Sequence, residues 1–143
     1  MNLALFDFDG TITRADTFTP FLRYAVRRQR QLAAWTLLWP LLVAYKTGLV
    51  SGSATRPIAA RFGLAGEPAD RVRALGRRYA QEVLPGVVRR RARERIAWHK
   101  QQRDTVVVVS ASLDVYLRPW CESMEVEVIC TELEERSGRF TGR

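Results

Sequence analysis

Apolar residues along the chain form three short runs that predict strands. Residues 2–8, 105–109 and 126–131 are each short and apolar, and turn-forming or polar residues bound them. The run at 106–109 is four consecutive valines, a pattern typical of a parallel strand that is covered on both faces. Near the C-terminus, Ser137-Gly138 predicts the turn of a β-hairpin within residues 132–143.

Between the first two predicted strands, the apolar spacing is helical. Phe18, Phe21, Leu22 and Ala25 share one face of a first predicted helix. Further helices are expected over residues 32–50, 54–62, 70–83, 86–102 and 113–124. Pro40 interrupts the first of these, and Pro85-Gly86 marks the boundary before the fourth. Ser112 is the expected N-cap of the last.

These elements predict an α/β fold with a Rossmann-like parallel sheet. Residues 1–15 and 104–143 would form the sheet-containing core. Residues 16–103 would form a helical insertion, placed directly after the first strand.

Composition narrows the class of protein. The chain has 143 residues, of which 47% are hydrophobic and 27% charged, and these values exclude a disordered or collagen-like chain. Cys121 and Cys130 are too few for a disulfide framework, and we interpret both as small buried residues. Asp7 and Asp9 interrupt the only early apolar run, so no signal peptide is visible, and we expect a cytoplasmic location.

The positive charge is concentrated in the middle of the chain. Residues 21–103 carry 18 Lys and Arg against four acids, a net charge of +14, whereas the formal charge of the whole chain is +8. Such a segment attracts anions: a phosphorylated molecule, an acidic membrane surface or nucleic acid. We do not expect nucleic acid, because the aromatic residues gather in an apolar run and do not alternate with the arginines.

The motif that carries chemistry is Asp7-Phe8-Asp9-Gly10-Thr11, which follows the first predicted strand. Two carboxylates at a strand end can act as nucleophile, metal ligand and proton carrier. Gly10 permits a tight turn, and Thr11 offers a hydroxyl and an N–H to an oxyanion. Taken alone, Asp-Gly is equally consistent with an acidic β-turn.

This motif resembles the D-x-D-G-T signature of the haloacid dehalogenase-like (HAD) phosphatases. The apolar strand that ends in Ser110 is similar to the second motif of the family, and residues 16–103 resemble the helical cap of the phosphoserine-phosphatase-like branch. The resemblance implies that Asp7 is the nucleophile and forms an aspartyl-phosphate, and that Asp9 is the general acid and base.

The resemblance also implies a cofactor and a phosphate site. Mg²⁺ would bind the Asp7 side chain and the Asp9 main-chain carbonyl, a suitable pair because Mg²⁺ prefers oxygen ligands. Ser110 would hydrogen-bond the phosphoryl group, with help from the backbone N–H groups of Gly10, Thr11 and Ala111.

Two parts of the family pattern are missing from the sequence. No lysine occurs after Lys100, and the late acids Glu132, Glu134 and Glu135 do not match the acidic cluster that completes the Mg²⁺ shell in the family. We therefore expect a chain that lacks the C-terminal third of such an enzyme, leaves its first strand at a sheet edge, and is weakly active or inactive unless another chain completes the sheet.

Residues 32–45 form an uncharged stretch with Trp35, Trp39 and Tyr45. This stretch is too short to span a bilayer, and a buried cap helix and an interfacial anchor both explain it. Residues 5–50 are similar to the bacterial phosphatidylglycerophosphatase C-like proteins of this branch, which implies a lipid phosphate substrate and contact of residues 32–50 with an anionic membrane, at its inner face. A soluble substrate such as phosphoserine, or an incompetent fragment that serves as a membrane-binding module, remain the alternatives.

Two further features are interpreted as structural. His99 has no metal-ligating partners at a suitable spacing, so we expect a structural role. The arginines at 89–95 spread around a predicted helix, which indicates a mainly solvated face.

Overall fold

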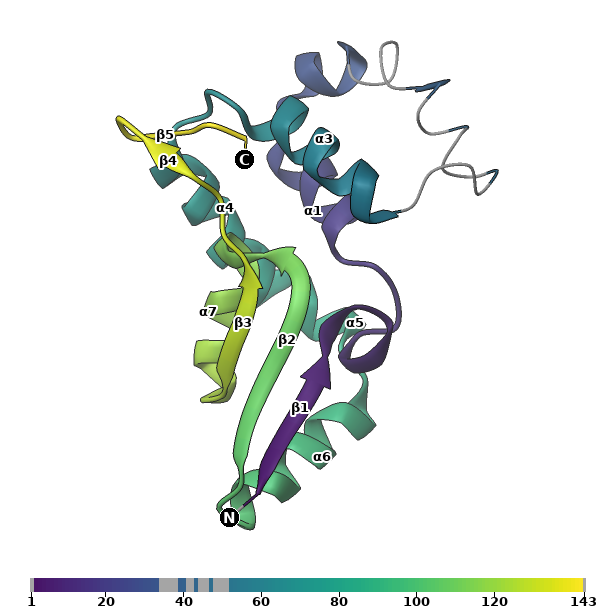
Figure 1. Cartoon of the computed structure of the whole chain (residues 1–143), viewed down its shortest axis with the longest axis vertical. Coiled ribbons are helices and arrows are strands. Elements are labelled where there is room, and N and C mark those ends of the chain that lie inside the picture. Colours follow the sequence, from purple (N-terminus) through teal and green to yellow (C-terminus); the bar gives the residue numbers. More distant parts are fainter. Residues whose placement is uncertain (1, 34–38, 41–42, 44–46, 48–51, 143) are drawn as a thin grey trace. The chain divides into compact units, whose positions relative to one another are not determined.

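The computed structural model describes residues 2–33, 39–40, 43, 47 and 52–142. Three parallel strands form one sheet in the order β1-β2-β3, as Figure 1 shows. Their bounds are β1 Leu3–Asp7, β2 Thr105–Leu113 and β3 Glu127–Thr131. The remaining elements are the π-helical turn η1 (Phe8–Ile12), α1 (Phe18–Ala25), α3 (Gly52–Leu64), α4 (Ala69–Glu82), α5 (Leu84–Val87), α6 (Arg90–Gln101), α7 (Asp114–Met124), β4 (Glu135–Arg136) and β5 (Arg139–Phe140). The α/β fold with a parallel sheet is confirmed.

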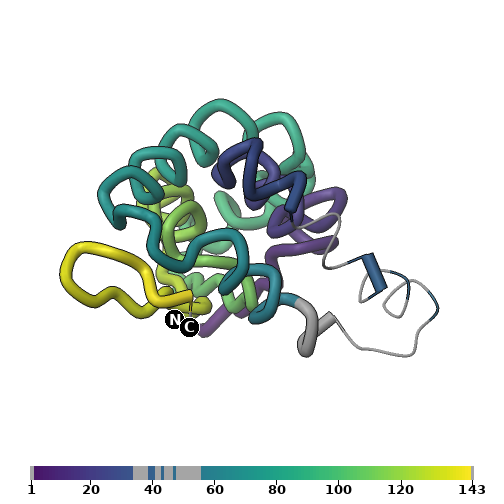
Figure 2. Tube along the Cα trace, turned by 90° about the horizontal axis from the view of Figure 1, so that it is seen from above, coloured from purple at the N-terminus to yellow at the C-terminus, as the bar shows by residue number. Residues whose placement is uncertain are grey.

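The chain divides into two compact units. The first combines Met1–Phe21 with Arg73–Glu132, and the second combines Leu22–Val72 with Leu133–Arg143. These bounds differ from the expected core and insertion, because α6 packs against β2 and the C-terminal hairpin bonds to residues 66–69. Figure 2 follows this hairpin, in yellow, after β3.

The sheet of the first unit has one covered and one exposed face. Phe8 packs against Trp120 of α7 with ring centroids 5.0 Å apart, and Val108 and Ile96 are fully buried on the same side. On the other face, Leu3, Leu5 and Ile129 are each more than 60% exposed. Among the described strands β1 pairs with β2 alone, so β1 lies at an edge, as expected.

An aromatic cluster holds the beginning of α1 in the first unit. Phe21, Tyr79 and Tyr116 pack around one another with ring centroids 4.7–5.4 Å apart. Gly76 allows α4 to approach α7 closely, since a Cβ atom there would lie 2.0 Å from the carbonyl oxygen of Val115.

One detail of the predicted elements is wrong. Ser112 is not a helix cap, because β2 continues through it and Leu113 precedes α7 without a capping side chain. The predicted boundary at Pro85-Gly86 is confirmed, because α4 ends at Glu82, both residues lie in the short α5, and α6 begins only at Arg90 after the extended Arg89. The helix predicted over residues 32–50 lies largely outside the described residues.

His99 has the structural role that we expected. Its Nδ1 lies 3.0 Å from Asp104 Oδ2, and Oδ1 of Asp104 accepts the Asn2 N–H at 2.8 Å. These bonds join the beginnings of β1 and β2. Cys121 is buried, which raises the pKa of its thiol to about 12, while Cys130 is half-buried rather than buried.

The second unit is organised around a buried carboxylate. Glu67 is 3% exposed, and the guanidinium groups of Arg71, Arg27 and Arg30 lie 3.0, 3.4 and 3.7 Å from its oxygens. The backbone of Glu67 also binds the C-terminal hairpin, because its carbonyl oxygen accepts the N–H of Phe140 at 3.1 Å. Within the part of the chain that the structure describes, no helix has the length and hydropathy to cross a membrane.

Candidate active site

The site lies where β1 ends beside the C-terminal half of β2. Asp7, the last residue of β1, is in register with Val109, and Ser110 follows Val109 directly. Because carboxyl ends of parallel strands meet at one edge of a sheet, Asp7 and Ser110 lie at the same edge. Asp7 is exposed, and its Oδ2 accepts a hydrogen bond from the Thr11 hydroxyl at 3.0 Å.

The turn η1 carries the chain away from Asp7. Gly10 has φ +82°, a left-handed conformation that other residues rarely adopt. Its N–H donates to the Thr13 hydroxyl at 3.2 Å, and the Thr13 N–H closes the turn on Phe8 O at 2.9 Å. The Gly10 N–H and the Thr11 hydroxyl, which we expected to face an oxyanion, are therefore engaged within the turn.

Asp9 is held from two sides. Its Oδ1 accepts both the N–H of Thr17 at 2.9 Å and the hydroxyl of Thr17 at 2.7 Å. Its Oδ2 accepts the Ser112 hydroxyl at 2.5 Å. Asp7 and Asp9 thus bind different partners, and the carboxylate of Asp9 is oriented by the segment before α1 and by β2.

A bulge in β2 places the two serines. From Val109 to Leu113 the strand advances four residues, whereas β3 advances two, from Ile129 to Thr131. Bulges redirect side chains and are frequent beside functional sites. Here the bulge buries Ser112 completely, leaves Ala111 exposed, and lets the Ser112 N–H donate to Ser110 Oγ at 3.1 Å.

Two tyrosines support Thr17 from the protein interior. The Tyr79 hydroxyl donates to Thr17 O at 3.2 Å, and the Tyr116 hydroxyl lies 3.2 Å from Thr17 Oγ1. The single hydroxyl proton of Thr17 is directed at Asp9, so Tyr116 is the donor in this pair. Burial, with smaller contributions from the charges of Asp16 and Asp9, raises the pKa of Tyr79 to about 12, and burial also raises the pKa of Tyr116. Both phenols therefore remain protonated near neutral pH.

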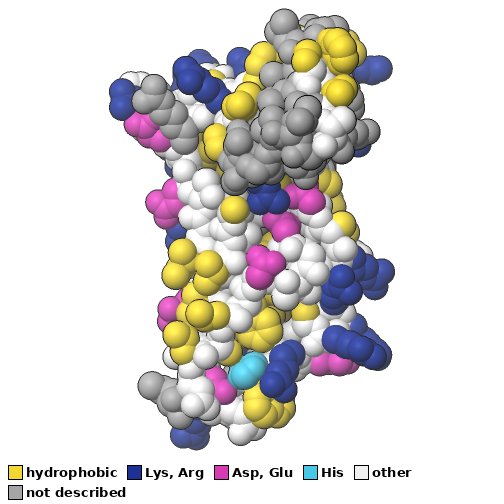
Figure 3. All heavy atoms as spheres, turned by 45° about the vertical axis from the view of Figure 1, so that its right-hand side comes forward, with side chains coloured by type: hydrophobic (Ala, Val, Ile, Leu, Met, Phe, Trp, Pro, Cys, Tyr) yellow, Lys and Arg dark blue, Asp and Glu magenta, His cyan; other side chains and the backbone are white. Residues whose placement is uncertain are grey.

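Arg89 braces the turn from the other side. Its Nε lies 3.1 Å from Thr13 O, its Nη2 lies 3.4 Å from Gly10 O, and its N–H donates to Ile12 O at 2.8 Å. Arg89 is exposed as predicted, and it precedes α6 in an extended conformation that also directs its guanidinium group to the turn. Arg90, Arg91, Arg93 and Arg95 are exposed as predicted, and Lys and Arg side chains appear at several separate places in Figure 3.

This arrangement agrees with a family comparison. The model of the haloacid dehalogenase-like hydrolase family matches residues 4–143. The chain belongs to this family. A comparison with curated protein sequences gave no significant match.

Solved structures show the same fold as this haloacid dehalogenase-like chain. A protein of unknown function from Bordetella pertussis Tohama I superposes with a TM-score of 0.79 at 22% identity over 99% of this chain and 65% of its own. A phosphoserine phosphatase in a phospho-aspartyl intermediate analogue gives 0.64 at 20% identity, over 99% and 61%. A probable phosphoserine phosphatase from Vibrio cholerae gives 0.68 at 12%, over 99% and 40%. The chain therefore spans 65% or less of the length of these proteins.

The haloacid dehalogenase-like site offers oxygen ligands suited to a hard cation. Asp7 presents an exposed carboxylate, and of its two oxygens only Oδ2 accepts a hydrogen bond from the described residues. No group of three carboxylate, imidazole or thiol side chains converges on one point among the described residues. The donor set fits Mg²⁺, which commonly binds one or two carboxylates and takes its other ligands from water and phosphate.

Sequence reasoning found the strand-end residues and missed their supports. The structure places Asp7 at the end of β1, Asp9, Gly10 and Thr11 in the turn η1 that follows, and Ser110 and Ala111 in the bulge of the neighbouring strand β2. Ser112 was interpreted as a cap, and Thr13, Thr17 and Arg89 were given no role at the site. The contact of Ser112 with Asp9 joins residues 103 apart in sequence, and that of Arg89 with Thr13 joins residues 76 apart, so no local sequence pattern predicts these contacts.

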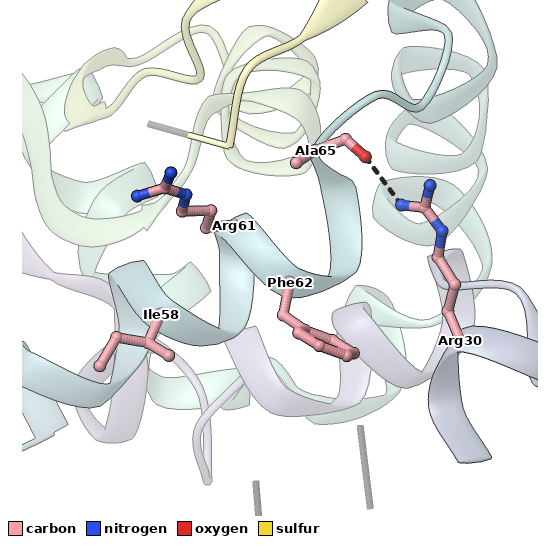
Figure 4. A pocket seen from close by; sticks show the side chains of 5 residues that line it. All are labelled: Arg30, Ile58, Arg61, Phe62 and Ala65. Carbon is pink, nitrogen blue, oxygen red and sulfur yellow. Dashed lines mark hydrogen bonds between the residues drawn. The ribbon is translucent and has the colours of Figure 1, made fainter. Parts of the chain in front are cut away.

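A separate cavity lies in the second unit of this haloacid dehalogenase-like chain. Its volume is about 540 Å³, and Figure 4 shows the five residues that line it: Arg30, Ile58, Arg61, Phe62 and Ala65. Arg30 donates from Nη1 to Ala65 O at 2.7 Å. The lining therefore combines two cations with apolar side chains.

Proposed function

We propose that this protein is a Mg²⁺-dependent phosphomonoesterase that acts through an aspartyl-phosphate on Asp7. The observation that carries this proposal is the exposed Asp7 carboxylate at the end of β1, beside the β2 segment in which Ser110 begins the bulge. Membership of the haloacid dehalogenase-like hydrolases supports it.

In the first step an oxygen of Asp7 attacks the phosphorus atom of the substrate. The bond between phosphorus and the leaving oxygen breaks, and protonated Asp9 gives that oxygen its proton. In the second step water attacks the phosphorus, its proton passes to Asp9, and phosphate leaves as the Asp7 carboxylate is restored. Dividing the displacement in this way replaces one difficult step with two easier ones.

Several groups hold the reacting parts in place. The Thr11 hydroxyl fixes Asp7 through Oδ2, and Ser110, with the N–H of Ala111, faces the transferring phosphoryl group in this proposal. The Asp7 side chain and the Asp9 main-chain carbonyl would hold Mg²⁺. When bound, the ion supplies positive charge that offsets the charge on phosphate and carboxylate.

We further propose that the substrate is a lipid phosphate such as phosphatidylglycerophosphate. Leu32, Trp39 and Val43 are 63%, 59% and 48% exposed, as an interfacial contact requires. The cavity with Arg30 and Arg61 fits an anion that carries apolar groups. The protein would then lie in the cytoplasm, peripherally at an anionic membrane that residues 32–50 touch.

The second candidate substrate is soluble. Two solved structures with this fold are phosphoserine phosphatases, one of them a substrate complex with a TM-score of 0.62 and 20% identity. The chain spans at most 65% of the length of these relatives, so its activity on either substrate is a proposal. A membrane-binding module is the non-enzymatic alternative.

The deciding experiment measures phosphate release with Mg²⁺ from phosphatidylglycerophosphate in mixed micelles and from phosphoserine. Asp7→Asn is the control, because it keeps the shape of the side chain and removes the nucleophilic charge. Release that disappears in Asp7→Asn supports the proposed chemistry, and the preferred substrate decides between lipid and soluble phosphate. Release that persists in Asp7→Asn rejects Asp7 as the nucleophile.

A further inference from the structure

We propose that Ser112 is a positioning residue that fixes the orientation of the Asp9 carboxylate for proton transfer. This inference rests on the proposed function, in which Asp9 carries the proton to the leaving oxygen. It assigns a site role to the second serine of the β2 bulge, the one that does not face the phosphoryl group.

The Asp9 carboxylate is held at both oxygens by donors that lie far apart in the sequence. Thr17 holds Oδ1 with its N–H and its hydroxyl, and Ser112 holds Oδ2 at 2.5 Å. Two donors on one oxygen leave rotation of the carboxylate plane about the Cβ–Cγ bond weakly restrained. A donor on the other oxygen fixes that plane.

Ser112 is itself immobile. Its side chain is fully buried, the bulge fixes its backbone, and its N–H is bound to Ser110 Oγ at 3.1 Å. The hydroxyl donates to Asp9 and also contacts the Tyr116 hydroxyl, whereas the backbone N–H serves Ser110. Ser112→Ala removes that hydroxyl and leaves the N–H contact to Ser110, so the variant separates the orientation of Asp9 from the placement of Ser110.

The test compares two leaving groups on the full chain. Glycerol 3-phosphate releases an alkoxide that needs a proton, whereas 4-nitrophenyl phosphate releases a stabilised phenolate that needs little help. We expect Ser112→Ala to lower kcat for glycerol 3-phosphate about 10- to 100-fold, with KM nearly unchanged, because a misplaced acid loses much of its contribution. For 4-nitrophenyl phosphate the decrease is expected to stay within about threefold.

Ser123→Ala is the matched control, since it removes a serine hydroxyl that bonds only to Trp120 O within α7. It should leave both rates as in the wild type. Equal losses on the two substrates in Ser112→Ala, or no loss, overturn the positioning role. If the wild type releases phosphate from neither substrate, the proposed function fails instead.

A double-mutant cycle measured by equilibrium unfolding tests the contact between Ser112 and Asp9 independently of catalytic activity. Ser112→Ala should raise the unfolding equilibrium constant about tenfold when Asp9 is present, and only about twofold or less in an Asp9→Ala background. That difference would show that the hydroxyl acts on Asp9. Additive effects of the two substitutions would overturn the inference.

Discussion

The Thr11 hydroxyl donates to Oδ2 of Asp7 at 3.0 Å, across the turn that Gly10 makes with its positive φ. This bond joins the beginning and the end of the motif. It leaves Oδ1 as the oxygen of Asp7 without a hydrogen bond from the described residues. In the proposed mechanism Oδ1 is therefore the attacking atom, and Thr11 sets its direction.

Thr11→Val should lower the rate at which Asp7 is phosphorylated by about tenfold, because valine has the shape of threonine and no hydroxyl. Thr11→Ser, which retains the hydroxyl, should stay within about twofold of the wild type. Rapid-quench measurement of the phosphoenzyme gives this rate directly. Equal rates in the valine and serine variants would show that the hydroxyl does not orient Asp7.

Arg89→Met should loosen the turn without unfolding the protein. Methionine keeps an apolar stem and removes the bonds to Thr13 O and Gly10 O. We expect hydrogen exchange at the Thr13 amide, which closes the turn on Phe8 O, to accelerate about fivefold.

Arg91→Met is the matched control for this variant. Arg91 is exposed on α6 and makes no hydrogen bond or ion pair with the described part of the chain. Equal acceleration of hydrogen exchange in both variants would mean that the lost charge, and not the loss of the Arg89 hydrogen bonds to Thr13 O and Gly10 O, opens the turn.

These supports explain why the sequence predicted the site only in part. The run before Asp7 and the valines before Ser110 predict strands from local pattern alone, and parallel pairing then brings the two strand ends together. Ser112 faces Asp9 because β2 contains a bulge, and a bulge depends on register with β3. Arg89 resembles its exposed neighbours in sequence, and only the path of the chain between α5 and α6 directs it to the turn.

The second unit should depend strongly on Glu67. Glu67→Gln replaces a buried carboxylate among three guanidinium groups, and we expect a loss of about 2–3 kcal/mol in the free energy of unfolding. Urea denaturation measures this loss. Glu82→Gln is the matched control, because Glu82 is 62% exposed and pairs with Arg78 on the surface of α4. Its effect should stay below about 0.5 kcal/mol, and similar losses in both variants would contradict a special role for Glu67.

The contact between His99 and Asp104 predicts an acid dependence of stability. The hydrogen bond from His99, followed by the Asn2 N–H, lowers the pKa of Asp104 below its ordinary value of 3.8. A lowered folded-state pKa stabilises the protein above the unfolded value and loses this effect as the pH falls through the folded value. The difference in urea midpoint between wild type and Asp104→Asn should therefore be largest above pH 5 and should decrease below about pH 4. A difference in urea midpoint that stays constant across this pH range would show that the ionisation of Asp104 does not contribute to stability.

The exposed face of the sheet should bind apolar dyes and promote self-association. Leu5 is 62% exposed on the edge strand β1, and it shares its face with Leu3 and Ile129. Parallel sheets are normally covered on both faces, so this surface is unusually apolar for solvent. Leu5→Lys should reduce anilinonaphthalene sulfonate fluorescence and the sedimentation coefficient at high protein concentration. The free energy of unfolding should change by less than about 0.5 kcal/mol, since the side chain is already in water.

Leu32→Lys tests whether the effect belongs to the sheet. Leu32 is 63% exposed but lies in the other unit, so the substitution adds the same charge at a position of equal exposure. We expect it to leave dye binding and sedimentation closer to those of the wild type than Leu5→Lys does. Equal reductions in the two variants would trace the association to added positive charge on a chain that already carries +8, and not to the uncovered face.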